Sequence, residues 1–493
     1  MFDSVTGEQF YVKGIAYQPG GQANVDVLTN GKACERDVKY LKELGVNTVR
    51  VYGAQPGKNH DACMAALEKG GIYLMLDLPI PDKSIKRDMP RYDVEILKHY
   101  MGNVDAFSKY SNVLGFVAGN EVTNDIKTTE ASAHIKAAIR DTKAYIAKRG
   151  LKIPVGYVDN DDPAIRKNIQ DFFNCGTKEE RADFYGINIY SWCGESSFEK
   201  SGYKERTAEL KDYGIPVFLA EYGCNVAATR PFNEIDSIYG SDMQDVFSGG
   251  FVYEYSYEEN KYGLVKINGN NVEVLDDYNT VKSRLTKVNP KKINAKTYNP
   301  TNKPRECPKV SETWKCSSKL PPTPSEEACR CAYETLSCRV NKAGTLPENG
   351  KTIGEQLGYI CEHGVCTQVT ADVAKGVYGP FSTCDSKVAN SIIFNAAVAK
   401  GNICDFKGMA EKVTPTQRNI DQCPKKATTL IAQSETPKPT GTPKQDNKPK
   451  TPSSQGSAYQ RPTQGSYQSP QPSGITPYAH GRPLKCHKRR RNV

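Results

Sequence analysis

Two glutamates stand at the ends of apolar, strand-like runs. Glu121 closes the run 113–121, and Glu221 closes the run 216–221. A charge beside buried apolar residues is costly, so each needs a partner or a function. Two carboxyl groups facing each other could cleave a glycosidic bond, because one protonates the departing oxygen while the other stays ionised and attacks the anomeric carbon. The alternative is that a glutamate forms a buried scaffold ion pair with an arginine.

Short apolar runs alternate with amphipathic helical stretches from residue 10 to about residue 282. This alternation predicts a (β/α)8 TIM barrel, an α/β fold in which Glu121 and Glu221 end the fourth and seventh strands and meet at one rim. An open doubly wound sheet is the alternative, but no glycine-rich phosphate loop follows the first strand. The expected strands are 10–17, 46–52, 72–78, 113–119, 153–158, 182–190, 215–222 and 249–257.

Length and composition indicate a chain of several units. Its 493 residues exceed what one hydrophobic core usually organises. The sequence is 38% apolar and 25% charged with a mean hydropathy of −0.60, as in ordinary soluble proteins. It contains no run of about 18 apolar residues, so no membrane-spanning helix is expected.

The net charge of +10 is concentrated at the C-terminal end of the chain. Of the 66 basic and 56 acidic residues, 13 and 2 respectively lie in 424–493, which leaves 53 and 54 before it. A neutral folded part argues against a nucleic-acid partner. The segment 424–493 also holds 11 of the 30 prolines, and its composition predicts a disordered tail, either an O-glycosylated stalk or an unmodified linker.

Cysteines are dense in the second half of the chain. Eleven of the 16 lie from Cys307 onwards, eight of them within 316–404. This density predicts a small disulfide-rich module in an oxidising compartment. Zinc is the alternative, but the pairs 329/331 and 361/366 do not repeat a metal-binding spacing and only His363 lies nearby, so we expect no metal.

Four regions follow from these features. They are a catalytic domain at 1–284, a linker at 285–306, a Cys-rich module at 307–423 and the basic tail at 424–493.

Seven stretches of the first domain resemble, in order, the fungal β-1,3-glucanosyltransferases of glycoside hydrolase family 72, a family of glycolipid-anchored surface proteins. The Cys-rich segment is similar to the carbohydrate-binding module that follows the barrel in one branch of that family. The matching stretches are 10–19, 47–52, 76–79, 119–122, 184–194, 218–224 and 248–255.

The resemblance implies a role for each of several residues. Glu121 would be the general acid/base and Glu221 the nucleophile of a retaining reaction, which places their carboxyl groups about 5 Å apart. Asn120 would bind the sugar 2-hydroxyl, and Tyr190 would hold the nucleophile through its phenol. Four further residues would line the sugar subsites: Gln18, Tyr52, Asp77 and Tyr253.

The resemblance also implies a disulfide pattern and a set of partners. The expected barrel bridges are Cys34–Cys63, Cys193–Cys224 and Cys175–Cys307. Within the module, Cys361–Cys366 is a plausible local pair from its short spacing, and the other pairings stay open. We expect β-1,3-glucan donor and acceptor chains as partners, no cofactor, a monomer, and a location at the outer face of the plasma membrane or in the wall. The sequence shows neither an export signal nor an anchor signal, so we expect either an incomplete sequence or an unanchored secreted form.

Two other functions remain open at this stage. An endo-β-1,3-glucanase would have the same two carboxylates and let water accept the sugar, so the choice of transfer depends on the resemblance alone. A non-catalytic binder of wall glucan would keep its function after the substitutions Glu121→Gln and Glu221→Gln.

Overall fold

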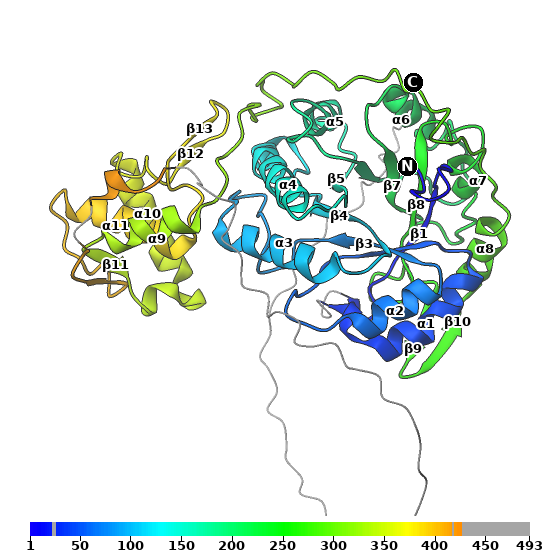
Figure 1. Ribbon diagram of the computed structural model, residues 1–493, viewed down its shortest axis with the longest axis horizontal. Helices are drawn as coiled ribbons and strands as arrows, with labels where there is room; N and C mark the ends of the chain where they lie inside the picture. The colour runs from blue at the N-terminus through cyan, green and yellow to red at the C-terminus, as the bar shows by residue number, and fades with distance from the viewer. Residues whose placement is uncertain (22–25, 417–418, 426–493) are drawn as a thin grey trace, which may run out of the picture. The chain divides into compact units, whose positions relative to one another are not determined.

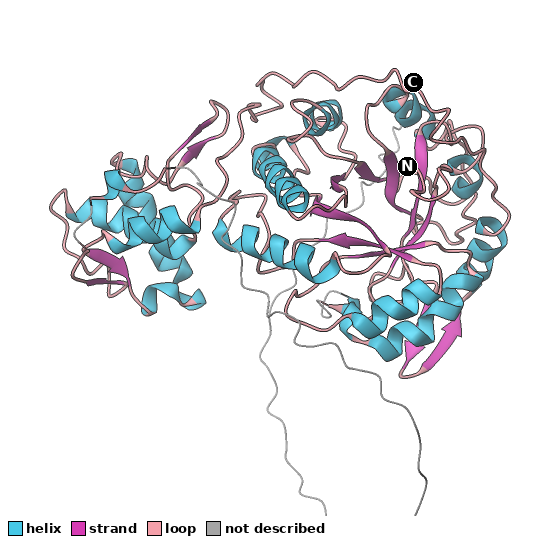
Figure 2. Cartoon of the chain, in the orientation of Figure 1, coloured by secondary structure: helices cyan, strands magenta, loops and turns pink. Residues whose placement is uncertain are grey.

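The first 285 residues form a closed barrel of eight parallel strands (Figures 1 and 2). The protein is represented by a computed structural model that describes residues 1–21, 26–416 and 419–425. The predicted tail therefore lies outside the described residues from 426 onwards. The barrel prediction is confirmed, and neighbours in chain order are neighbours in the sheet. The strands are β1 Val12–Ala16, β2 Thr48–Val51, β3 Tyr73–Asp77, β4 Val113–Asn120, β5 Val155–Asp159, β6 Tyr185–Asn188, β7 Val217–Tyr222 and β8 Phe247–Val252.

Helices pack around the outside of the strands, and their ends follow local sequence signals. The helix α3 is capped by Asp93, whose side chain accepts from the N–H groups of Glu95 and Ile96. The helix α1 is capped in the same way by Asn30, which accepts from Ala33. The helices are α1 Gly31–Glu43, α2 Asp61–Lys69, α3 Val94–Phe107, α4 Ala131–Lys148, α5 Arg166–Asn174, α6 Tyr203–Leu210, α7 Glu234–Ile238 and α8 Asp276–Leu285.

The barrel interior is filled by side chains, so chemistry is confined to its rim. Phenylalanines supply much of this filling, among them Phe184, Phe218 and Phe251. Two strand glycines make room for them. A Cβ atom at Gly14 would lie 2.3 Å from the ring of Phe251, and one at Gly156 would lie 2.3 Å from that of Phe184.

The sequence analysis missed a hairpin after β8. The strands β9 (Val265–Asn268) and β10 (Asn271–Val274) are antiparallel and joined through Gly269, whose φ is +61°. The expected eighth strand, 249–257, was placed too late, because β8 ends at Val252 and the chain then leaves the barrel. The missed signal was a glycine turn between two short alternating segments.

The disulfide-rich module that we expected is present. Its helices are α9 Glu326–Glu334, α10 Gly350–Glu362 and α11 Ser386–Val398. Two pairs of short antiparallel strands accompany them: β11 (Cys338–Val340) with β14 (Ala410–Lys412), and β12 (Ala371–Asp372) with β13 (Val377–Tyr378). Four bridges hold it together: Cys329–Cys384, Cys331–Cys423, Cys338–Cys404 and Cys361–Cys366. The last of these is the local pair that we expected.

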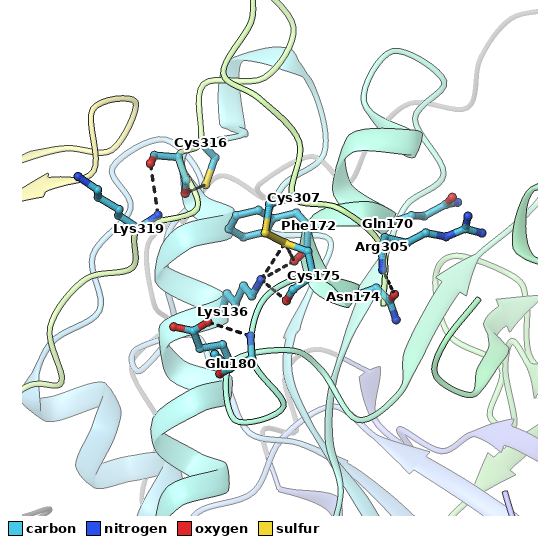
Figure 3. Close-up of a disulfide and its surroundings, with 12 residues drawn as sticks. Lys136, Gln170, Phe172, Asn174, Cys175, Glu180, Arg305, Cys307, Cys316 and Lys319 are labelled. Carbon is cyan, nitrogen blue, oxygen red and sulfur yellow. Dashed lines mark hydrogen bonds between the residues drawn. A yellow bond between two sulfur atoms is a disulfide. The ribbon is translucent and has the colours of Figure 1, made fainter. Parts of the chain in front are cut away.

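The bridge Cys175–Cys307 fastens the connecting segment to the end of α5 (Figure 3). Lys136 on α4 points at this bridge, and its Nζ donates to the carbonyl oxygens of Phe172 at 2.7 Å and Cys175 at 2.9 Å. Burial lowers the pKa of Lys136 to about 8. Nearby, Cys316 has a free thiol, and burial raises its pKa, which makes it a poor nucleophile.

No helix in the described part of the chain is both long and apolar enough to cross a membrane.

Candidate active site

Glu121 follows the last residue of β4 in an unusual backbone conformation. Its φ is +49°, in the left-handed region that residues other than glycine rarely adopt. The Glu121 N–H donates to the carbonyl of Val158 at 2.9 Å, and the pairing of β4 with β5 shifts register just before this point. Such strain is typical of functional positions and costs about 1–3 kcal/mol. The neighbouring strand therefore holds this glutamate in its conformation at the rim.

Glu221 lies within β7 and is 7% exposed. Three donors reach its carboxylate. The hydroxyl of Tyr52 donates to Oε1 at 2.9 Å and that of Tyr190 to Oε2 at 2.7 Å. The Nη1 of Arg50 lies 3.2 Å from Oε1. Three donors hold the carboxylate in one orientation and favour its ionised form, as a nucleophile requires.

Arg50 connects the site and was missed by the sequence analysis. It lies on β2, is fully buried, and donates to both oxygens of Asp77 at 3.1 and 2.8 Å. Its Nη2 also donates to Oδ1 of Asn120 at 2.9 Å. Burial alone would lower the pKa of Arg50, but Asp77, Tyr52 and Glu221 together raise it. A cation inside a short apolar strand was the signal that could have found it.

The scaffold ion pair considered as an alternative is present, since Glu221 does pair with an arginine. However, Arg50 also binds Asp77 and Asn120, so the pair belongs to a network that includes the rim. Asp77 has both oxygens on Arg50, which makes it a partner of that arginine; its role as a subsite residue stays a prediction.

Asn120 and Glu121 are linked by a second residue that the sequence analysis did not identify. Asn188, the last residue of β6, donates through Nδ2 to Oε1 of Glu121 at 2.7 Å and to Oδ1 of Asn120 at 3.2 Å. Through Asn188, Asn120 and Arg50, the two glutamates share one continuous hydrogen-bond network.

Tyrosines line the rim beside this network. The ring of Tyr253 lies edge-on to those of Tyr52, Tyr190 and Tyr262, with centroids 6.5, 6.1 and 5.1 Å apart. Its hydroxyl accepts from Nδ2 of Asn260 at 3.3 Å. Aromatic faces and phenol groups suit sugar rings, which present C–H faces and hydroxyls. Tyr262 was not predicted.

Gln18 lies on the segment that follows β1 and is 9% exposed. Its Nε2 is 3.5 Å from the carbonyl oxygen of Gly21. The predicted contact of Gln18 with sugar stays a prediction.

The two glutamates interact electrostatically. Burial is the main cause that raises the pKa of Glu221 to about 7, and the charge of Glu121 adds to it. Arg50, Tyr190 and Tyr52 oppose this rise. The raised pKa thus falls on Glu221, the expected nucleophile, and its three donors Arg50, Tyr190 and Tyr52 are what favour its ionised form.

The bridge Cys193–Cys224 joins the two loops that leave this site. Cys193 lies three residues after Tyr190, and Cys224 lies three residues after Glu221. The bridge closes a loop of 31 residues, which contributes about 3–4 kcal/mol in the chain-entropy view. A second bridge, Cys34–Cys63, joins α1 to α2. The four cysteine pairs expected from the sequence are thus all bonded in the structure.

Comparison with known proteins finds two families along the chain. Residues 1–289 match the family model of the glycoside hydrolase 72 glucanosyltransferases, and residues 336–411 match that of the X8 domain. The chain is 44% identical to pH-responsive protein 1 of Candida albicans over 428 residues, which is 83% of this chain and 77% of that protein. It is 46% identical to the 1,3-beta-glucanosyltransferase GAS2 of Saccharomyces cerevisiae over 404 residues, 78% of this chain and 72% of that one.

A solved structure is similar over most of both chains. Saccharomyces cerevisiae Gas2p in complex with laminaritriose and laminaritetraose superposes with a TM-score of 0.76 at 45% identity, covering 81% of this chain and 91% of that one. The match of the family model to more than half of the residues, together with these relatives, settles the family. The chain is a member of the glucanosyltransferase family, glycoside hydrolase family 72.

Proposed function

We propose that this protein is a retaining β-1,3-glucanosyltransferase that cleaves one β-1,3-glucan internally and joins the new reducing end to the non-reducing end of another. The observation that carries the proposal is the pair of carboxyl groups at one barrel rim, with Glu221 held by Arg50, Tyr52 and Tyr190. The similarity to a structure that contains laminari-oligosaccharides supports the choice of substrate.

In the first half-reaction, the Glu221 carboxylate attacks the anomeric carbon, and the glycosidic C–O bond breaks. Protonated Glu121 gives its proton to the departing oxygen, which leaves with the reducing-end fragment. The product is a glucosyl ester on Glu221 and an ionised Glu121. Arg50, Tyr52 and Tyr190 donate to the carboxylate before it reacts, so they fix its orientation toward the sugar.

In the second half-reaction, the 3-hydroxyl at the non-reducing end of an acceptor glucan attacks the anomeric carbon of the ester. Glu121 now accepts the proton of that hydroxyl, and the ester bond to Glu221 breaks. Asn120 would donate to the sugar 2-hydroxyl, a contact that strengthens as positive charge develops on the ring. Both carboxyl groups return to their starting states.

We place this activity outside the cell, at the cell surface or in the wall. Seven disulfide bridges among the described residues suit an oxidising compartment. A monomer is sufficient, since one chain supplies both carboxyl groups. Attachment through a glycolipid is an expectation from the family.

The length of the products tests transfer against hydrolysis. The protein is incubated with one linear β-1,3-oligosaccharide whose reducing end has been chemically reduced. Mass spectrometry should then show products longer than the substrate together with shorter ones. If all products are shorter than the substrate, the protein is a hydrolase. If none of either kind forms, it is a binder.

The pH profile should depend on Tyr190. Because the nucleophile must be ionised, kcat/KM should rise as the pH passes the pKa of Glu221, which burial raises to about 7. The substitution Tyr190→Phe removes a donor to the ionised carboxylate, so the acidic limb should move about 1–2 pH units higher. The measurement is kcat/KM for oligosaccharide transfer across pH.

The variant Tyr213→Phe is the matched control for this shift. It also removes a buried phenol, one that donates to the carbonyl of Gln170 on the outer side of the barrel. Its acidic limb should stay in place. Equal profiles for the Tyr190→Phe variant and the unchanged protein would contradict the role of Tyr190.

A further inference from the structure

Asn188 contacts both Asn120, the last residue of β4, and Glu121, the residue that follows it. It is 3% exposed and lies at the end of β6, where it pairs in register with Glu221 on β7. One amide nitrogen serves two acceptors, Oε1 of Glu121 at 2.7 Å and Oδ1 of Asn120 at 3.2 Å. Both hydrogen bonds that this buried amide donates within the described part of the chain reach these two residues, which gives it a defined geometric task.

The first consequence concerns the amide of Asn120. Its Oδ1 receives two donors, Nη2 of Arg50 at 2.9 Å and Nδ2 of Asn188 at 3.2 Å. Because the oxygen and nitrogen of an amide lie on opposite sides, these donors fix which way the group faces. The Nδ2 of Asn120 is turned away from both donors and can donate to a sugar hydroxyl.

The second consequence concerns the proton on Glu121. An N–H donor on Oε1 occupies a lone pair of that oxygen, so the acidic proton is favoured on Oε2. The other charged or titratable groups that face Glu121 are Glu221 on β7, Asp159 and Tyr157 on β5, and Arg87, which donates to its backbone carbonyl at 2.8 Å.

We propose that Asn188 is a positioning residue that assigns the acid/base proton to Oε2 of Glu121 and orients the amide of Asn120 toward the sugar. The proposal rests on the function proposed above. It adds a positioning residue on β6 for Glu121, which follows β4. The nucleophile Glu221 is held by other residues, namely Arg50, Tyr52 and Tyr190.

Two variants test it, Asn188→Ala and Asn188→Asp. Loss of one hydrogen bond to a charged group should lower kcat for an oligosaccharide donor about 10- to 100-fold. With a β-1,3-glucosyl fluoride donor, fluoride leaves without a proton, so the release of fluoride in a single turnover should lose only what the Asn120 contact contributes, at least roughly threefold less than the loss with the oligosaccharide.

The variants Asn112→Ala and Asn112→Asp are matched controls. Asn112 is also a buried amide, but it lies before the first residue of β4, at the end opposite the rim, and donates to the carbonyls of Met64 and Ile72. These controls should leave the ratio of oligosaccharide to fluoride rates unchanged, whatever they do to stability.

An Asn188→Ala variant with equal losses on both donors would overturn the proposal, since a purely structural role predicts that outcome. The variant Glu121→Gln, assayed alongside, separates this failure from a failure of the proposed function. If Glu121→Gln keeps full activity with oligosaccharides, the function itself is wrong. If it is inactive while Asn188→Ala behaves as the unchanged protein, only the role of Asn188 is wrong.

Discussion

The substitution Glu221→Gln is expected to abolish both cleavage and transfer, lowering kcat at least roughly 10⁴-fold. A glutamine amide cannot attack the anomeric carbon to form the ester. Among the residues that the structure describes, no other carboxylate is bound by Arg50, Tyr52 and Tyr190 together. The shape of the side chain is preserved, and Arg50 keeps its two bonds to Asp77. The measurement is the rate of appearance of longer and shorter oligosaccharides.

The variant Glu234→Gln serves as its control. Glu234 is likewise buried, and burial raises its pKa to about 7, but it lies on α7 outside the strands. Transfer by this variant should stay within about threefold of the unchanged protein. A 2-fluoro-substituted β-1,3-glucosyl donor with an activated leaving group should also label Glu221, identified by mass spectrometry of the peptide. Label on another residue, or an active Glu221→Gln variant, would rule out this glutamate as nucleophile.

The barrel could be predicted from sequence because its signal is repeated eight times. Each strand is a short apolar run, and each is followed by a helical stretch, so errors in single boundaries do not change the topology. The boundary errors fall where the chain leaves regular structure. The expected strand 182–190 is reduced to β6, Tyr185–Asn188, because a register shift between β6 and β7 ends regular pairing at Asn188.

The catalytic candidates were visible in the sequence for a similar reason. Glu121 and Glu221 each interrupt an apolar run at a strand end, where a charge is conspicuous. Asn188 also stands at a strand end, but a neutral amide there fits solvent, a turn or a neighbour equally well. Its role depends on its hydrogen bonds to Asn120 and Glu121, which belong to a different part of the barrel rim. No local sequence pattern encodes contacts between residues so far apart in the chain.

Arg50 shows a different limit. It lies within the stretch 47–52 that carried the family resemblance, yet its partners come from β3, β4 and β7. A single cation in a strand of four residues is conspicuous in the sequence, but the sequence does not show which side chains it meets. Only closure of the barrel turns it inward, where it joins Asp77, Asn120 and Glu221 into one network.

The substitution Glu121→Gln is the second large effect, an expected loss of about 10²- to 10⁴-fold in kcat with an oligosaccharide donor. The departing oxygen of a glucan needs a proton, and a glutamine cannot supply one. A fluoride donor removes that need, so the ester on Glu221 should still form. The second half-reaction then stalls, because no base accepts the proton of the acceptor hydroxyl.

Azide separates this role from a structural one. Azide is a nucleophile that needs no base, so it should attack the glucosyl ester of the Glu121→Gln variant and restore turnover with the fluoride donor. Because attack on the ester inverts a centre that was already inverted once, the product should be the β-glucosyl azide. The unchanged protein and a Glu221→Gln variant should show no such gain. An α-azide would contradict a covalent intermediate on Glu221, and an absence of rescue by azide would contradict Glu121 as the base for transfer.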